Sequence, residues 1–222
     1  MNLFKTLSAI FEKEHQKYLK EFLMHLDIEF FIDAGAYEGN FLRNFNTSNI
    51  KYVYMFEPNI NKYQQLKEKN KDFFIFNYAL SNKKGMENFL INETDDTTST
   101  LESVIDTNSV LYFVKTNILN ASYKNKIQVE TEKLDNIFDN EIYRKSFLKI
   151  DTEGSDYEVL KGGEELLSKI DYVLVEVKKL NFYRNCKKND IYELLFEKKF
   201  RIKKIFSSFP HFYQDSLFEK EI

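Results

Sequence analysis

Apolar residues recur every three or four positions near the start of the chain, with charged residues between them. This spacing over residues 3–26 predicts one or two amphipathic helices, and we expect an N-terminal helical segment over residues 1–28. The polar positions carry charges of both signs rather than an excess of basic residues. We therefore expect this segment to pack on the protein instead of lying on a membrane surface.

Beyond residue 28 the pattern changes to short apolar runs separated by helix-like stretches. The runs predict strands at residues 29–33, 51–57, 73–77, 85–91, 127–131, 147–151, 171–176, 200–206 and 216–219. The stretches between them predict helices at residues 40–46, 60–70, within 101–118, 156–168 and 189–198. Near-continuous apolar strands that alternate with helices are typical of a mainly parallel sheet covered by helices on both faces.

Length and composition fit one domain. The chain has 222 residues, of which 43% are hydrophobic and 30% charged, so a sizeable core can form. We expect a single domain over residues 1–222, with the polar segment 94–126 as an insertion or lid. The formal net charge of -3 argues against a protein held to nucleic acid by general electrostatics. Assembly into a homo-oligomer stays open.

Cysteine content and hydropathy exclude several further classes of protein. The single Cys186 cannot form an internal disulfide, and no cysteine–histidine spacing predicts a zinc site. No apolar stretch approaches the roughly 20 residues of a membrane span. Charges also interrupt the N-terminal segment where a signal peptide would be apolar. We therefore expect a cytoplasmic protein with no membrane span and no nucleic-acid partner.

Four of the predicted strands end in an acidic residue, namely Asp33, Glu57, Asp151 and Glu176. In an open parallel sheet the carboxyl ends of the strands border the ligand crevice. The four acids together therefore favour a cleft for a polar ligand at that edge. An acid at the end of the second strand suits the two hydroxyls of a ribose.

The turn after the first strand holds two of the 6 glycines in the chain. Gly35 lets the backbone pass close to a ligand, and Gly39 lets the next helix begin tightly against the strand. Tyr37 occupies the second glycine position of the dinucleotide fingerprint G-x-G-x-x-G, so the turn disfavours NAD and FAD. A nucleoside without phosphates, such as S-adenosylmethionine, fits this turn better.

A second motif spans Lys149–Gly163 and reads KIDTEGSDYEVLKGG. An apolar strand leads into Asp151, Glu153 and Gly154, and the pair of glycines at the end of the motif predicts a helix C-cap. We expect the two acids to lie beside the glycine turn of the first strand. The alternative is that Asp151 orients backbone and Glu153 begins the helix.

Taken in order, these motifs resemble those of the FkbM-type methyltransferases. The matching segments are Phe31–Gly39 for I-D-x-G-A-N-x-G, Met55–Pro58 for F-E-P, Asn77–Ser81 for N-x-A-L, Thr98–Leu101 for S-S-L, Lys133–Asp135 for T-L-D, and Leu148–Gly154 with Val159–Gly162 for K-I-D-x-E-G…L-K-G. The resemblance implies an S-adenosylmethionine-dependent enzyme of the α/β class. Its fold would be the class I methyltransferase Rossmann-like fold, with a mostly parallel seven-stranded sheet and helices on both faces.

The resemblance also implies which residues bind S-adenosyl-L-methionine. The implied set is Asp33, Gly35, Ala36, Tyr37, Gly39, Glu57, Pro58, Asn59, Asn77 and Ala79. The first turn lines the methionine and ribose, Glu57 holds the ribose hydroxyls, and the remaining residues border the adenine. Tyr37 replaces the family's usual Asn, and Asp156 replaces its usual Glu.

Methyl transfer to a hydroxyl needs a base for the hydroxyl proton. Asp151 and Glu153 are the candidate catalytic residues, and His211 in a C-terminal loop is a rival base. We predict no metal ligand, while a Mg²⁺ ion held by Asp151, Glu153 and Glu176 stays an alternative.

No motif defines the methyl acceptor. FkbM-type enzymes act on hydroxyls of glycans and of secondary metabolites, and a chain without a carrier or synthase domain favours a sugar or sugar nucleotide. We expect a role in surface polysaccharide biosynthesis, such as capsule or lipopolysaccharide. Segment 94–126 and the aromatic residues Phe209, Phe212 and Tyr213 are candidates for the acceptor pocket. The alternatives are a secondary-metabolite acceptor, a non-catalytic nucleoside-binding protein, and a nicotinamide-dependent oxidoreductase, which the absent second glycine disfavours.

Overall fold

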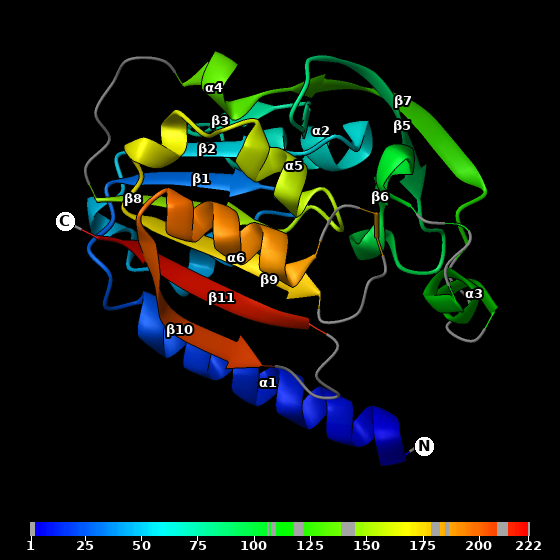
Figure 1. Cartoon of the computed structure of the whole chain (residues 1–222), viewed down its shortest axis with the longest axis horizontal. Coiled ribbons are helices and arrows are strands. Elements are labelled where there is room, and N and C mark those ends of the chain that lie inside the picture. The colour runs from blue at the N-terminus through cyan, green and yellow to red at the C-terminus, as the bar shows by residue number, and fades with distance from the viewer. Residues whose placement is uncertain are drawn as a thin grey trace.

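A computed structural model (Figure 1) describes residues 3–105, 107, 110–117, 122–138, 145–178, 183–184, 187–207 and 213–221. Within these residues a seven-stranded sheet has the strand order β10-β11-β9-β8-β1-β2-β3. Its strands are β1 (Phe30–Ala34), β2 (Tyr52–Phe56), β3 (Phe74–Phe76), β8 (Ser146–Ile150), β9 (Tyr172–Lys178), β10 (Phe200–Ser207) and β11 (Tyr213–Lys220). Strand β11 is antiparallel to both of its neighbours, and the other neighbouring strands are parallel. The mostly parallel α/β sheet predicted from the sequence is confirmed.

The helices differ from the sequence prediction in their ends, and the helix predicted over residues 40–46 is a 3₁₀ turn at Asn40–Asn44. The described helices are α1 (Leu3–Leu23), α2 (Ile60–Lys69), α3 (Val110–Asn117), α4 (Leu134–Ile137), α5 (Asp156–Lys161) and α6 (Lys188–Glu197), with 3₁₀ turns η1 (Asn40–Asn44), η2 (Thr47–Asn49), η3 (Asp96–Thr98), η4 (Glu102–Val104) and η5 (Leu166–Ser168). The N-terminal segment forms one long helix, and the helix predicted over residues 156–168 is divided into α5 and η5. Of the helices described, none combines the length and the apolar character that crossing a membrane requires.

The central strands β1 and β8 are buried along their whole length. Because successive side chains of a strand point to opposite faces, Ile32 and Leu148 join one apolar cluster, whereas Phe31 and Phe147 join another. Helices α5 and α6 supply buried residues to the first cluster, and α1 and α2 supply them to the second (Figure 1). The continuous apolar runs of the sequence therefore reflect burial on both faces.

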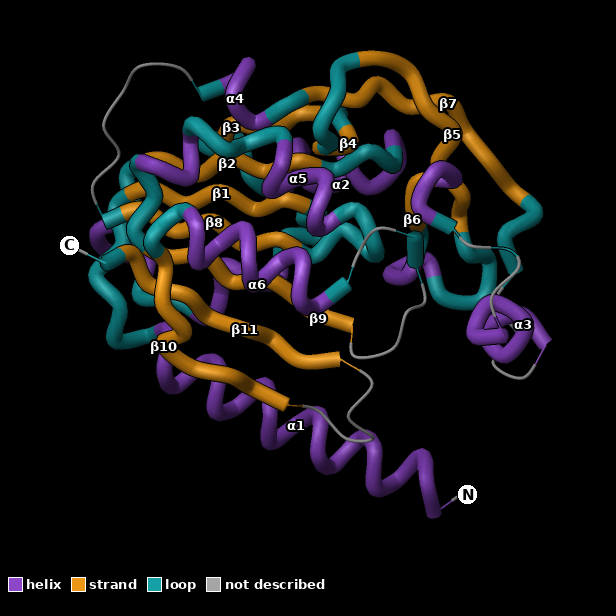
Figure 2. Tube along the Cα trace, viewed as in Figure 1, coloured by secondary structure: helices purple, strands orange, loops and turns teal. Residues whose placement is uncertain are grey.

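A second, four-stranded sheet has the order β4-β7-β5-β6 (Figure 2). Its strands are β4 (Ala79–Leu80), β5 (Gly85–Ile91), β6 (Thr100–Leu101) and β7 (Asn125–Glu132). The antiparallel pairing of β5 with β7 runs from Gly85 opposite Thr131 to Ile91 opposite Asn125. The sequence predicts strands in both places but not their pairing. The polar segment 94–126 follows β5, contributes β6 to this sheet and leads into β7.

His15 connects α1 to the far end of the chain. Its Nε2 is hydrogen-bonded to Oδ2 of Asp215 on β11 at 2.6 Å, and its ring packs edge-on against Phe206 of β10 at a centroid distance of 6.1 Å. Leu19 and Leu23, further along the same helix, are buried in the second apolar cluster. The N-terminal helix is thus part of the folded core, as the mixed charge of its polar positions predicts.

Gly162 ends α5 for a reason that the sequence does not reveal. The predicted C-cap is there, but its φ of −78° lies in the right-handed region, which any residue adopts. A Cβ on Gly162 would instead lie 2.1 Å from the carbonyl oxygen of Ser81, directly after β4. Glycine is required because α5 packs against the chain that leaves the second sheet.

Replacing Gly162 with alanine should destabilise the protein, since a methyl group cannot fit against the Ser81 carbonyl. We expect the free energy of unfolding to fall by about 1–3 kcal/mol in urea denaturation. Gly85→Ala is the matched control, because a Cβ there meets Thr131 Oγ1 at an ordinary 3.9 Å. The control should change stability by less than about 0.5 kcal/mol. Equal losses in the two variants would contradict this account.

Candidate active site

The turns that follow β1 and β8 meet at the carboxyl edge of the main sheet. The two strands are parallel neighbours, with Ala34 opposite Ile150. Gly35 has a φ of +80°, and a Cβ on it would lie 2.1 Å from the carbonyl oxygen of Asp151. Conformation and space both require glycine at this position. This backbone contact brings the predicted cofactor turn next to Asp151, a predicted catalytic residue.

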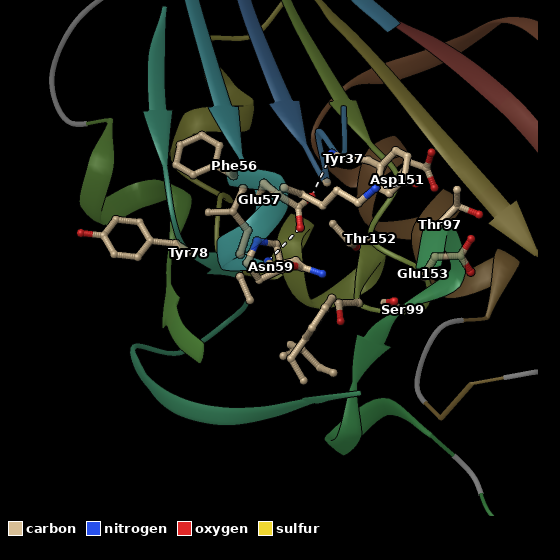
Figure 3. A pocket seen from close by; sticks show the side chains of 18 of the residues that line it. Tyr37, Phe56, Glu57, Asn59, Tyr78, Thr97, Ser99, Asp151, Thr152 and Glu153 are labelled. Carbon is tan, nitrogen blue, oxygen red and sulfur yellow. Dashed lines mark hydrogen bonds between the residues drawn. The ribbon is translucent and has the colours of Figure 1, made fainter. Parts of the chain in front are cut away.

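Glu57, directly after β2, connects the turn after β1 to the turn before α2 through its carboxylate. Its carboxylate accepts hydrogen bonds from the backbone N–H groups of Tyr37 and Asn59, each at 2.8 Å (Figure 3). Burial raises the pKa of Glu57 to about 7, although both N–H donors act against the increase. The carboxylate oxygens retain lone pairs that can accept further hydrogen bonds from hydroxyl groups.

Two asparagines shape the loop that presents Glu57. Asn77 Nδ2 donates to the carbonyl oxygens of Glu57 and Pro58, at 2.8 and 2.9 Å. Asn59 Oδ1 accepts a hydrogen bond from the N–H of Asn61 at 3.0 Å and so caps α2. These bonds fix the path of the chain beyond β2 and β3.

A narrow cavity of about 60 Å³ lies between these loops (Figure 3). The predicted cofactor-binding residues that line it are Gly35, Tyr37, Glu57, Pro58, Asn59 and Ala79. The predicted catalytic residues Asp151 and Glu153 line it as well. Of the other predicted residues, Ala36 lines an adjoining groove, whereas Asp33, Gly39 and Asn77 line neither space.

Tyr37 helps to close this cavity. Its hydroxyl donates to Oδ1 of Asp96 at 2.6 Å, and Lys62 Nζ contacts both the Tyr37 hydroxyl at 2.8 Å and Asp96 Oδ2 at 3.0 Å. Asp96 lies on η3, in the segment predicted to be an insertion or lid. The contacts of Tyr37 and Lys62 with Asp96 thus hold η3 against the cavity.

A wide groove of about 960 Å³ adjoins the cavity. The two spaces share Gly35, Tyr37, Thr97, Asp151 and Glu153. The groove is lined by residues of the N-terminal helix α1 and of η1, and by residues of β9 and β11. Predicted catalytic carboxylates thus lie where the cavity opens into the groove.

Asp33 is buried beneath the site, where it pairs with Lys149. The Lys149 Nζ lies 3.1 Å from Asp33 Oδ1 and 3.5 Å from Asp151 Oδ2, and it donates to the carbonyl oxygen of Gly35 at 2.9 Å. Burial raises the pKa of Asp33 above its usual value, although Lys149 acts against the increase. The sequence prediction missed Lys149, although a lysine within the buried run Phe147–Ile150 signals a partner of this kind.

A cluster of carboxylates borders the groove at the ends of β8 and β9. One oxygen each from Asp151, Glu153 and Glu176 lies within 4.8 Å of the others. Lys178 Nζ is 3.3 Å from Glu153 Oε2 and is hydrogen-bonded to Glu176. The hydroxyl of Tyr183 donates to Glu153 Oε2 at 2.9 Å. The sequence prediction found the three acids but not Lys178 or Tyr183.

Asp156 organises the turn that carries Asp151 and Glu153. Its buried carboxylate accepts hydrogen bonds from the N–H groups of Thr152 at 2.9 Å and Gly154 at 3.2 Å. Asp156, which replaces the usual Glu of the resembling family, therefore still accepts hydrogen bonds at the start of α5. Of the other candidates, Tyr213 lines the groove, whereas Cys186, Phe209, His211 and Phe212 lie outside the described residues.

Solved structures resemble this fold at low sequence identity. A methyltransferase FkbM from Methylobacillus flagellatus KT superposes with a TM-score of 0.56 at 15% sequence identity. The match covers 86% of this chain but only 43% of the length of the Methylobacillus chain. Magnesium protoporphyrin IX methyltransferase (ChlM) from Synechocystis PCC 6803, solved with bound SAM, gives a TM-score of 0.51 at 10% sequence identity, and the match covers 100% of this chain and 85% of the ChlM chain. The structure of the same enzyme with bound SAH gives a TM-score of 0.52 at 9% identity, and the match covers 100% of this chain and 88% of the ChlM chain. A comparison with curated proteins finds no match.

Residues 33–202 match the family described as Methyltransferase FkbM domain. This range runs from the end of β1 into β10 and contains the turn at Gly35, Glu57 and the carboxylate cluster. The family, the class I fold and the enzyme class predicted from the motifs are confirmed. The chain belongs to the FkbM family of methyltransferases.

Proposed function

We propose that this enzyme methylates a hydroxyl of a sugar or sugar nucleotide, in the cytoplasm, for surface polysaccharide such as capsule or lipopolysaccharide. The observation that carries this proposal is the wide groove beside Asp151 and Glu153. Tyr183 and Tyr213 add aromatic surface to the groove, and its carboxylates can accept hydrogen bonds from several hydroxyls of one acceptor. Such a lining suits a ring that carries many hydroxyl groups.

The residues around the narrow cavity suit S-adenosylmethionine. The buried carboxylate of Glu57 can accept hydrogen bonds from the ribose hydroxyls, and Gly35 lets the turn that carries Tyr37 pack directly against the Asp151 backbone. Phe56, Ala79 and Leu80 give the cavity an apolar side for the adenine. When bound, S-adenosylmethionine supplies a methyl group on a positively charged sulfur.

The two carboxylates at the junction of cavity and groove have different surroundings. The Asp151 side chain is 40% exposed, and Lys149 is its ion-pair partner at 3.5 Å. The Glu153 side chain is 13% exposed and already accepts hydrogen bonds from Tyr183 and Lys178. Asp151 is therefore better placed to take the proton of the acceptor hydroxyl. Glu153 would orient the acceptor by accepting from a neighbouring hydroxyl.

Affinity for S-adenosylhomocysteine should fall as the pH is lowered. The pKa of Glu57 is about 7, and protonation removes part of its capacity to accept from the ribose. We expect the dissociation constant, measured by titration calorimetry, to rise about tenfold between pH 8 and pH 6. Glu57→Gln should bind more weakly at pH 8 and should lack this dependence. A wild-type affinity that is constant over this range would contradict the assignment.

Methylation assays on a panel of sugars and nucleotide sugars test the reaction itself. Mass spectrometry should detect the gain of one methyl group on one member of the panel. Asp151→Asn and Glu153→Gln should each lower turnover by about 10²–10⁴-fold, as expected when a base or a positioning carboxylate is lost. Both variants should keep the wild-type affinity for S-adenosylhomocysteine.

Two surface substitutions provide matched controls for these variants. Asp72→Asn and Glu165→Gln remove the same charges at exposed positions that do not line the cavity or the groove. Both should turn over at the wild-type rate. Full activity in both Asp151→Asn and Glu153→Gln would contradict the proposed roles.

A further inference from the structure

The carboxylate cluster has the spacing of a cation site. One oxygen each from Asp151, Glu153 and Glu176 lies within 4.8 Å of the others. Carboxylate oxygens are the ligands that Mg²⁺ and Ca²⁺ prefer in proteins. Three ionised carboxylates so close together repel one another unless a positive charge lies among them. The ionised cluster therefore requires a cation at this point, whether bound or built in.

Lys178 provides a positive charge at this point. Its Nζ is 3.3 Å from Glu153 Oε2 and is hydrogen-bonded to Glu176, and its side chain is 12% exposed. Burial acts to lower the pKa of Lys178, but the carboxylates of Glu153, Glu176 and Asp151 outweigh it and raise the pKa well above its usual value. The ammonium group therefore stays protonated at neutral pH.

Several independent contacts hold this arrangement. Glu176 and Lys178 are two residues apart on β9, so their side chains leave the same face of the strand. Lys178 Nζ also lies 5.4 Å from the centroid of the Tyr213 ring. The Tyr183 ring, whose hydroxyl donates to Glu153, packs so closely on Gly154 that a Cβ there would lie 2.3 Å from it. Lys178 and Tyr183 thus both hold the Glu153 carboxylate.

We propose that Lys178 is the resident cation of this cluster, taking the place that a divalent metal ion would occupy, and that it positions Glu153 for the acceptor. A metal ion would have to displace the ammonium group from Glu153 and Glu176 before it could bind. The positioning role rests on the proposed function, because it assumes an acceptor in the groove. The exclusion of a metal ion rests on the geometry of Lys178 alone.

Metal binding tests this exclusion without any acceptor. Mn²⁺ should show no binding at this cluster in the wild-type protein, measured by electron paramagnetic resonance and by titration calorimetry. Lys178→Ala should bind one Mn²⁺ ion, because it leaves three acids without their cation. Lys178→Arg keeps the charge and should bind none. Lys145→Ala is the matched control, since Lys145 is also held by two carboxylates, Asp27 and Glu29, away from the groove.

Turnover tests the positioning role once an acceptor is known. Wild-type turnover should survive dialysis against a chelator. Lys178→Ala should lose about 10–100-fold in turnover, the loss expected when a positioning contact to a charged group is removed. Part of this loss should return with added Mn²⁺, and Lys178→Arg should keep most of the activity. Affinity for S-adenosylhomocysteine should stay unchanged, which also reports that each variant is folded.

Distinct results overturn the two proposals. Mn²⁺ binding to the wild-type cluster, or an alanine variant that binds none, overturns the resident-cation proposal. Wild-type turnover that a chelator abolishes and Mn²⁺ restores does the same. A wild-type enzyme that methylates no sugar overturns the proposed function, while the Mn²⁺ titrations still decide the role of Lys178. Lys178→Met replaces the alanine variant in these measurements if the latter lacks a cooperative unfolding transition.

Discussion

The order of the strands determines where this enzyme can form a site. From β1 the chain continues to β2 and β3 on one side, whereas from β8 it continues to β9 on the other side. The turns that leave β1 and β8 therefore diverge, and a crevice opens between them. Directly above the paired strands the two turns are still in contact, and Gly35 is required there. The predicted cofactor-binding residues on one side of the crevice and the carboxylate cluster on the other follow from this divergence.

Two lysines make it possible to place so many acids at this edge of the sheet. Lys149 on β8 lies among Asp33, Asp151 and the Gly35 carbonyl, and Lys178 on β9 contacts Glu153 and Glu176. A buried carboxylate left without its partner destabilises a protein by about 3–5 kcal/mol. The acids are therefore tolerated as parts of two mixed-charge groups, one below the predicted cofactor turn and one beside the groove.

The sequence predicts the parallel sheet because burial on both faces leaves continuous apolar runs, as in β1 and β8. It also locates Gly35, Glu57 and Asp151, since a turn or an acid directly after such a run lies at the crevice. The second sheet was not predictable in this way, because the pairing of β5 with β7 joins segments separated by a long polar stretch. Tyr37 and Asp96 are likewise far apart in sequence, and their hydrogen bond depends on how that stretch returns.

The contact between His15 and Asp215 has a consequence for how the chain folds during synthesis. Helix α1 leaves the ribosome well before β10 and β11, against which it packs. Until then Leu19 and Leu23 lack the part of their final surroundings that Phe206 supplies. The part of α1 that β10 and β11 cover is consequently exposed until those strands have been made, and a newly made chain is then open to aggregation and to chaperones.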